Sequence, residues 1–358
     1  MMDCRLYRGP EALDEVKPAW DALEARSAAH PYQRYDFARL WYETIGMSQR
    51  VKPIVVVLEC DGKAAGLFPA CVLSWGATRL LTWMGGPDQI DYGDILFDPD
   101  AADVTAEEFV HESLRLIRPR ARTAFTYFPN VRLDGVSYPG LSAELREFKR
   151  SSAPYVPLTG SLESLVAGLS RRNRKNLSRS LRQMEARGSY SLRWLDRASP
   201  EVTDSVARLI ALKRTRFTRA GQKTNLFKPA YAQFLHACAT HDPTFWVAEL
   251  VCEDEVAAIG MGHVYRQRSY GTQMAFEERF AESSPGRVLM YLTLKHWFGS
   301  GIEAYELGWG DEPWKYEWTN LEVPLVTFVS PHVGGQALSV LVEARRQAVR
   351  LMARESRA

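Results

Sequence analysis

Two segments of the chain, far apart in the sequence, share a pattern of strand, tight turn and strand. Residues 54–60 form an apolar, β-branched run, Asp61-Gly62 favours a hairpin turn, and residues 64–73 return as a second strand. Residues 245–252, an acidic turn at 253–255 and residues 256–265 repeat this order, and a shift of 193 residues places Asp61 on Asp254. Many unrelated hairpins look like this, but its occurrence in both halves predicts two related lobes.

Length and composition agree with a folded protein of two domains. The chain has 358 residues, against roughly 150 residues for an average domain. Hydrophobic residues make up 46% and charged residues 25%, which excludes a mainly disordered, collagen-like or coiled-coil protein. The net charge is only +2, so any site for an anionic partner is expected to be local rather than spread over the whole surface.

The sequence favours a cytoplasmic protein without a metal site. No apolar signal segment follows Met1, and the longest uncharged apolar-rich run, residues 64–78, is interrupted by Pro69 and Gly76 and is too short to span a bilayer. The cysteines are odd in number and form no CxxC pair, which is typical of reduced core thiols: Cys4, Cys60, Cys71, Cys238 and Cys252.

Periodicity and turn residues predict the remaining elements. We expect helices over residues 14–26, 36–45, 106–117, 170–188, 199–220, 229–239 and 286–298, and further strands over 124–128, 269–276 and 304–308. The segment 150–161, with its prolines and serines, is interpreted as a linker or crossover. The second half therefore reads β-β-β-α-β, a mixed sheet with one helix crossing over.

The first candidate site is the turn Ser284-Pro285-Gly286-Arg287, which connects a strand to a helix. Free N–H groups and the positive end of the helix dipole suit a diphosphate, and glycine permits close approach of the backbone. Arg287 would add a charged donor. Serine and proline are also ordinary helix-opening residues, so a purely structural role stays open.

The second candidate is the basic helix that Ser170 would cap and Gly188 would end. Seven basic residues accompany one acid, and four cluster in the first turns: Arg171, Arg172, Arg174 and Lys175. The helix dipole disfavours cations there, so a bound anion would relieve the strain. A nucleotide 3′-phosphate, an acidic phospholipid surface and RNA are all candidates, and so is a solvated basic face without a ligand.

Two further groups could take part in chemistry. The segment 305–318 places Trp309, Asp311 and Lys315 among glycines just after a strand, which indicates either a site or an Asp–Lys pair that closes a loop. His263 lies in an apolar strand and is either a core residue or a general base. Tyr291, on the helix after the turn, is either a packing residue or a proton donor.

Together these segments resemble the GNAT acyltransferase superfamily, in particular its two-lobed CelD-like and FemAB-like branch, over roughly residues 20–330. The resemblance rests on the basic helix, the hairpin through Ala257-Ala258, the Ser284-Pro285-Gly286 turn, and the strand followed by Gly308-Trp309-Gly310-Asp311 and Lys315. It implies an α/β (α+β) fold of two tandem GNAT-like lobes, each a mixed, mostly antiparallel sheet flanked by helices. The lobes would cover residues 1–150 and 151–335, followed by a basic amphipathic helix over 336–358.

The resemblance further implies an acyl-CoA co-substrate in the second lobe. The strand 269–276 would line the pantetheine through Met274 and Phe276, and the turn would hold the diphosphate through Ser284, Pro285, Gly286, Arg287, Val288 and Leu289. The usual Arg/Gln-x-x-Gly-x-Gly/Ala turn of the superfamily is only partly matched here. An amine acceptor would attack the thioester, with His263 or Asp311 accepting its proton and Tyr291 protonating the thiolate.

The acceptor and the donor both leave alternatives open. Abundant aromatic residues and the basic C-terminal segment favour a lipid amine, such as a sphingoid base giving a ceramide-like product, and peripheral binding to an anionic membrane. The CelD-like resemblance instead suggests a cell-envelope saccharide. A FemAB-like enzyme would use aminoacyl-tRNA to extend a peptide, and a GNAT-fold binding protein without activity is the third alternative.

Overall fold

The two hairpins expected from the sequence are both present and are built alike. In the first, β2 (Lys52–Cys60) pairs with β3 (Lys63–Trp75) through a turn at Asp61 and Gly62, whose φ angles are +49° and +71°. In the second, β9 (Phe245–Cys252) pairs with β10 (Glu255–Tyr265) through Glu253 and Asp254, at +44° and +53°. Two positive φ angles make the two-residue turn that suits the twist of a hairpin.

Both hairpins also carry a β-bulge at the same position after the turn. Ala65 lies between residues paired with Glu59 and Leu58, and Ala257 lies between residues paired with Val251 and Leu250. The turns and bulges coincide when the halves are shifted by 192 residues. The shift of 193 that the sequence suggested is therefore wrong by one residue, because matching Asp61 to Asp254 ignored the geometry of the turn.

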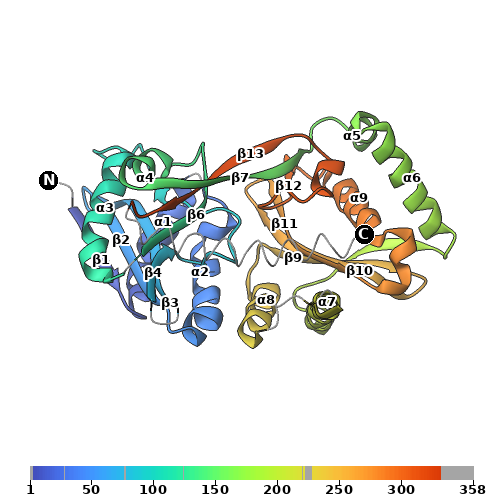
Figure 1. Cartoon of the computed structure of the whole chain (residues 1–358), viewed down its shortest axis with the longest axis horizontal. Coiled ribbons are helices and arrows are strands. Elements are labelled where there is room, and N and C mark those ends of the chain that lie inside the picture. The colour runs from blue at the N-terminus through green and yellow to red at the C-terminus, as the bar shows by residue number, and fades with distance from the viewer. Residues whose placement is uncertain are drawn as a thin grey trace. The chain divides into compact units, whose positions relative to one another are not determined.

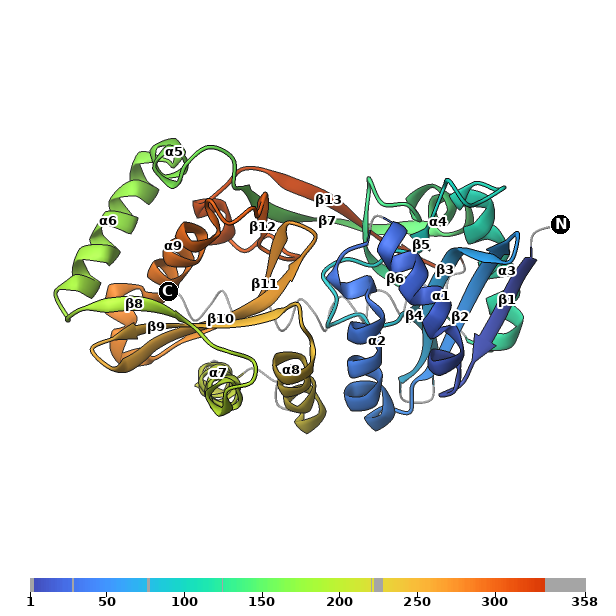
Figure 2. The same cartoon turned by 180° about the vertical axis from the view of Figure 1, so that it is seen from behind.

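The computed structural model describes residues 3–27, 29–75, 78–123, 125–219, 221 and 228–331 (Figures 1 and 2). One unit contains the described residues up to Ser152 and those from Val323 onward, and the other contains Ala153–Glu322. The last described strand thus belongs to the first unit rather than to the 151–335 lobe that we expected. The C-terminal helix expected over 336–358 lies outside the described residues.

The first unit is a mixed sheet with the strand order β1-β2-β3-β4-β6-β13 and with β5 on β3. Helices α1 and α3 both pack on β2 and β3. Its other elements are β1 (Asp3–Arg8), α1 (Ala12–Arg26), α2 (Tyr35–Trp41), a π-helical turn (Tyr42–Gly46), β4 (Thr78–Trp83), β5 (Leu96–Phe97), α3 (Ala106–Ala121), β6 (Phe125–Arg132), α4 (Tyr138–Glu144) and β13 (Glu322–Val329).

The second unit has the strand order β7-β12-β11-β10-β9-β8. Helices α7 and α8 cover one face of this sheet, and α6 and α9 lie on the other (Figures 1 and 2). Its other elements are β7 (Arg146–Pro157), α5 (Leu162–Gly168), α6 (Arg171–Glu185), β8 (Tyr190–Trp194), α7 (Pro200–Arg219), α8 (Pro229–His241), β11 (Arg268–Phe276), the 3₁₀ turn η4 (Glu278–Ser283), α9 (Pro285–Trp297), β12 (Ala304–Glu306) and the 3₁₀ turn η5 (Lys315–Glu317).

The two units repeat one order of elements and exchange their last strands. In each, a strand and two helices precede a hairpin, a fourth strand, a helix and a parallel strand: β6 pairs in parallel with β4, and β12 with β11. The next strand in the chain after β6 is β7, which pairs with β12, whereas β13 follows β12 and pairs with β6. The predicted class, two lobes with mixed, mostly antiparallel sheets flanked by helices, is confirmed.

The expected linker is a strand over most of its length. Residues 150–157 belong to β7, and Ala153 and Val156 are fully buried in it. The chain does pass from the first unit to the second between Ser152 and Ala153. The prolines misled the prediction because a proline lacks only the N–H donor and can still stand in a strand. The carbonyl of Pro154 accepts a hydrogen bond from Leu307 N at 2.9 Å.

Candidate functional site

The turn before α9 has a helix N-terminus that is not capped by a side chain. Ser284 occupies the N-cap position with φ +48°, and the first turn holds no acid. The carbonyl of Ser284 accepts hydrogen bonds from Arg287 N and Val288 N, while Gly286 N has no backbone acceptor within the described residues. A partly exposed N–H at the positive end of a 13-residue helix can bind an anion.

Strand β11 supplies the side chains next to this turn. A Cβ added to Gly286 would lie 3.2 Å from Met274 Sδ and 4.0 Å from Phe276, so glycine keeps the space between helix and strand open. Met274, Phe276, Ser284, Gly286 and Arg287 are partly exposed. Three other residues of the proposed turn have buried side chains, so only their backbone could contact a ligand: Pro285, Val288 and Leu289.

Strand β11, which the resemblance assigned to the pantetheine chain, pairs with β12 over only part of its length. The parallel pairing of β11 with β12 covers Arg268, Ser269 and Tyr270 only, although β11 continues to Phe276. A Cβ on Gly271, the next residue, would lie 2.4 Å from the hydroxyl of Tyr305. Burial raises the pKa of Tyr305, so this hydroxyl keeps its proton and can act as a hydrogen-bond donor.

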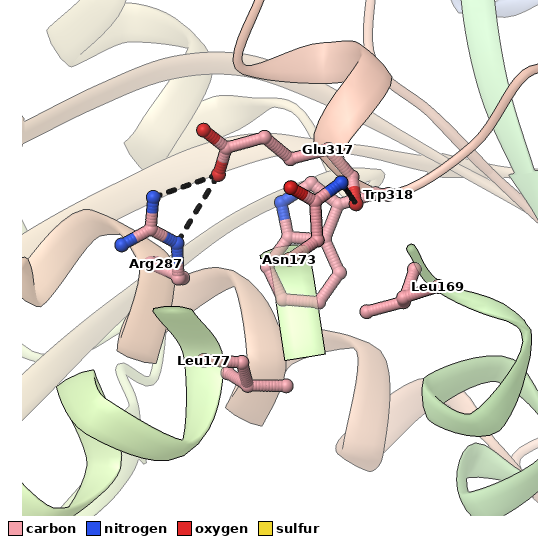
Figure 3. A pocket seen from close by; sticks show the side chains of 6 residues that line it. All are labelled: Leu169, Asn173, Leu177, Arg287, Glu317 and Trp318. Carbon is pink, nitrogen blue, oxygen red and sulfur yellow. Dashed lines mark hydrogen bonds and ion pairs between the residues drawn. The ribbon is translucent and has the colours of Figure 1, made fainter. Parts of the chain in front are cut away.

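Arg287 is already ion-paired. Its guanidinium donates to Glu317 Oε2 at 2.8 and 3.1 Å and to Ser180 Oγ at 3.2 Å. Figure 3 shows this pair at a small hollow that is also lined by Leu169, Asn173, Leu177 and Trp318. An anionic ligand at the turn would therefore compete with Glu317 for Arg287, which the sequence did not reveal.

The basic helix forms as α6, with Ser170 Oγ accepting from Asn173 N at 3.1 Å. Arg171, Arg172, Arg174 and Lys175 are all exposed. Arg174 is engaged, because its guanidinium donates to the carbonyl oxygens of Ala167 and Leu169.

Lys315 closes a loop, but its ion pair is with Glu312, whereas the structural alternative named an aspartate. It is buried, and its ammonium donates to the carbonyls of Gly308, Trp309 and Gly310 at 2.8, 2.9 and 3.2 Å. Glu312, 3.0 Å away, completes the pair, whereas Asp311 is exposed. The expected role of Lys315 in binding an anion does not fit this geometry, because its donors are used within the loop.

His263 and Tyr291 lie on opposite faces of the second sheet. His263 is 2% exposed, and its Nδ1 lies 3.2 Å from Thr244 Oγ1 and 3.5 Å from Asp242 Oδ2, next to the end of α8. Tyr291 is on α9 and packs against the apolar cluster between that helix and the sheet. The structure therefore does not bring these two candidates together at one reacting centre.

Sequence reasoning missed a polar group where β11 and β12 meet. The fully buried Glu306 accepts two hydrogen bonds from Arg268, at 2.6 and 2.9 Å. The parallel register places Glu306 beside Tyr270, the last paired residue of β11. A glutamate within an otherwise apolar strand was the one available signal, because buried carboxylates normally require a partner.

The described residues contain no group of three or more His, Cys, Asp or Glu side chains that could hold a metal ion. Nor is any helix within the described ranges long and apolar enough to cross a bilayer.

Comparison with known proteins places the second unit in a family. Residues 171–316 match the family described as "Acetyltransferase (GNAT) domain". No curated protein matches the chain. Among solved structures, FemX aligns over 94% of this chain and 100% of its own with a TM-score of 0.63 at 12% identity.

Two other solved structures align with most of the chain. The C-terminal domain of a putative lysylphosphatidylglycerol synthetase from Agrobacterium fabrum has a TM-score of 0.58 and 16% identity, covering 92% of this chain and 94% of its own. L-PGS from Bacillus licheniformis has a TM-score of 0.57 and 14% identity, covering 93% and 95%. At such identities the likeness concerns the fold. Residues 171–316 of the second unit therefore match the GNAT domain family, and the chain as a whole has a fold like that of FemX.

Proposed function

We propose that the second unit binds an acyl-CoA thioester and transfers its acyl group to a primary amine. The observation that carries this proposal is the combination of the uncapped N-terminus of α9 with Gly286. The diphosphate would accept hydrogen bonds from the first turn, and the pantetheine would continue along the part of β11 that β12 does not pair. Met274 and Phe276 would contact its apolar part.

The chemistry requires a neutral amine, a polarised carbonyl and a proton for the leaving thiolate. Tyr291 was the donor suggested by the sequence, but Tyr305 has the better position, because its hydroxyl lies against Gly271 where the two strands part. His263 and Asp311 are the sequence candidates for accepting the amine proton. His263 is buried beside Asp242, so an acceptor reaches it only if neighbouring residues move.

For the acceptor we propose a lipid-type amine, such as a sphingoid base that becomes a ceramide-like product, with a cell-envelope amino sugar as the alternative. One structure of similar fold supports this proposal, because it is named as a putative lysylphosphatidylglycerol synthetase and lysylphosphatidylglycerol is a lipid. The exposed cations of α6 would attract an anionic membrane surface.

A second donor class has its own support. The exposed Arg171, Arg172 and Lys175 form a basic surface on α6 that an RNA backbone would also contact. The likeness in fold to FemX extends over the whole of that chain. An aminoacyl-tRNA donor is therefore the competing proposal.

Titration with palmitoyl-CoA, acetyl-CoA and tRNA separates these proposals. We expect a rise in Tm with palmitoyl-CoA, followed by release of free thiol when a sphingoid base is added. A rise with tRNA alone would replace the acyl-CoA proposal by the aminoacyl-tRNA one. If none of the three ligands shifts Tm, the chain is better described as a binding protein without this activity.

A further inference from the structure

A second β-bulge marks the point where β11 leaves β12. Met261 pairs with Gln273 and Gly262 pairs with Gly271, so Thr272 is an extra residue in β11. Its hydroxyl donates to the carbonyl of Met261 at 3.0 Å. Bulges next to sites redirect side chains, and here Gln273 is directed to the face covered by α7 and α8.

Gln273 meets an unusual lysine there. Lys213, on α7, donates to Gln273 Oε1, and Gln273 Nε2 donates to the hydroxyl of Tyr231 on α8 at 3.1 Å. Within the described residues, this neutral amide is the acceptor for the Lys213 amine. A lysine with a largely buried side chain is normally paired with a carboxylate, so a lysine held by an amide is unusual.

The surroundings favour the neutral amine. Burial among α7, α8 and β11 and the nearby Arg216 lower the pKa of Lys213 to about 8, although the residue keeps some surface exposure. Glu249 lies on β9 beneath α7, and Glu277 follows β11. Neither carboxylate offsets the lowered pKa of Lys213, because each is ion-paired with an arginine. A substantial fraction of Lys213 is thus unprotonated near pH 8 and able to accept a proton.

We propose that Lys213 is the general base that removes a proton from the ammonium group of the acceptor. This inference rests on the proposed acyl transfer. The donor would be anchored on the α9 face and its thioester would lie beside Thr272, past the last pair of β11 with β12, so the amine would approach from the α7 and α8 face. Lys213 is partly exposed on that face, whereas His263 is fully buried.

The acceptor nitrogen gives up two protons in the course of the acyl transfer. One proton passes from the acceptor ammonium to the Lys213 amine and leaves an amine lone pair. That lone pair forms the N–C bond to the thioester carbonyl, and the C–S bond then breaks. The second proton on the acceptor nitrogen goes to the departing sulfur to give the free thiol, and Lys213 returns its proton to solvent.

The test uses Lys213→Met and Lys213→Arg with palmitoyl-CoA and a sphingoid base. Wild-type kcat/KM should rise with pH through about 8. Both variants should lose about 100-fold or more in kcat, while palmitoyl-CoA still raises their Tm as it does for the wild type. Arginine retains the charge but not the ability to give up its proton, so an active Lys213→Arg variant would overturn the proposal.

Gln273→Glu provides a second variant without loss of the lysine. A carboxylate next to the ammonium should raise the pKa of Lys213, so the rise in kcat/KM should move to higher pH. A purely structural Lys213 predicts an unshifted pH profile, which would contradict the proposal.

The outcomes for the two proposals differ. If the wild type transfers acyl groups and Lys213→Met stays within threefold of it, the assignment of Lys213 fails and the proposed function stands. If the wild type neither binds palmitoyl-CoA nor releases thiol, the proposed function fails and the assignment of Lys213 fails with it.

Discussion

The two units follow one plan but differ at the helix after the fourth strand. In the first unit, Thr105 and Glu108 cap α3: Thr105 Oγ1 accepts from Glu108 N at 3.2 Å, and Glu108 accepts in return from Thr105 N at 2.8 Å. In the second unit, α9 has no such cap and begins with Gly286 in its first turn. The same helix end is therefore occupied by its own side chains in one unit and available to a ligand in the other.

The fourth strands of the two units, β4 and β11, also differ. Trp83, at the end of β4, stacks on Phe68 at 5.3 Å between ring centroids and contacts Phe128 at 4.4 Å, so aromatic rings occupy the region past the last pair of β4 with β6. The ladder of β3 and β4 is unbroken, whereas that of β10 and β11 contains the bulge at Thr272. The two units share one framework, and the uncapped helix end and the bulge suited to a ligand are features of the second unit.

The largest expected effect comes from giving α9 the acidic first turn of α3. Gly286→Asp places a carboxylate where the diphosphate is proposed to bind, and its side chain needs the space beside Met274. We expect palmitoyl-CoA affinity to fall about 100-fold or more, from repulsion and lost N–H contacts. Isothermal titration measures the affinity.

The free energy of unfolding of Gly286→Asp is the control measurement. An acid in the first turn of a helix should offset part of the destabilisation that crowding beside Met274 causes. An unchanged affinity in a folded variant would mean that the donor does not use this turn. The contrast between the two helix ends would then have no functional meaning.

A buried histidine makes the first unit sensitive to acid. Burial, with a smaller effect of Arg132, lowers the pKa of His30 to about 3. Because the folded-state pKa lies below the unfolded value of 6.5, His30 destabilises the folded protein as the pH falls from about 6.5 toward 3, by about 1.4 kcal/mol per pH unit.

His30→Phe cannot titrate, so its free energy of unfolding should depend less on pH than that of the wild type. Denaturant unfolding at pH 7.5 and 5.5 measures this difference. His241→Gln, at an exposed position, is the control. Equal acid sensitivity in His30→Phe and wild type would contradict the neutral, buried state of His30.

Local signals were sufficient for much of the fold and for one part of the site. Asp61-Gly62 predicted a hairpin, and Ser170 and Pro285 predicted two helix starts, because each acts through its own neighbours. The exchange of β7 and β13 could not be predicted, since it depends on pairing between residues far apart in the chain. The same reason applies to Arg287, whose partner Glu317 is thirty residues away.

The group at Lys213 shows the same limit more sharply. Lys213, Tyr231 and Gln273 come from three elements and share no motif, so only the folded sheet brings them together. Lys315 was recognised as a candidate, but its role depended on where three carbonyl groups point. Sequence patterns identify polar residues at strand ends, whereas their partners are set by tertiary packing.

The cap of α3 should matter for stability alone. Thr105→Ala removes the acceptor for Glu108 N and should cost about 0.5–2 kcal/mol of unfolding free energy. Palmitoyl-CoA affinity should stay within twofold of wild type, because this helix end is occupied by its own side chains. A large loss of affinity would mean that the first unit also takes part in donor binding.

The smallest expected effect tests whether Glu317 restrains Arg287. Glu317→Gln removes the carboxylate that pairs with the guanidinium at 2.8 Å but keeps a polar side chain of the same shape. We expect palmitoyl-CoA to bind about three- to tenfold more tightly, since the freed Arg287 can meet the diphosphate, with a loss of up to about 1 kcal/mol in stability. Titrations of wild type, Glu317→Gln, Arg287→Gln and the double variant form a cycle that isolates the coupling. If Glu317→Gln binds no more tightly than wild type, Arg287 is a structural link between α6 and α9, and the donor site of the second unit consists of the backbone turn at Gly286 without it.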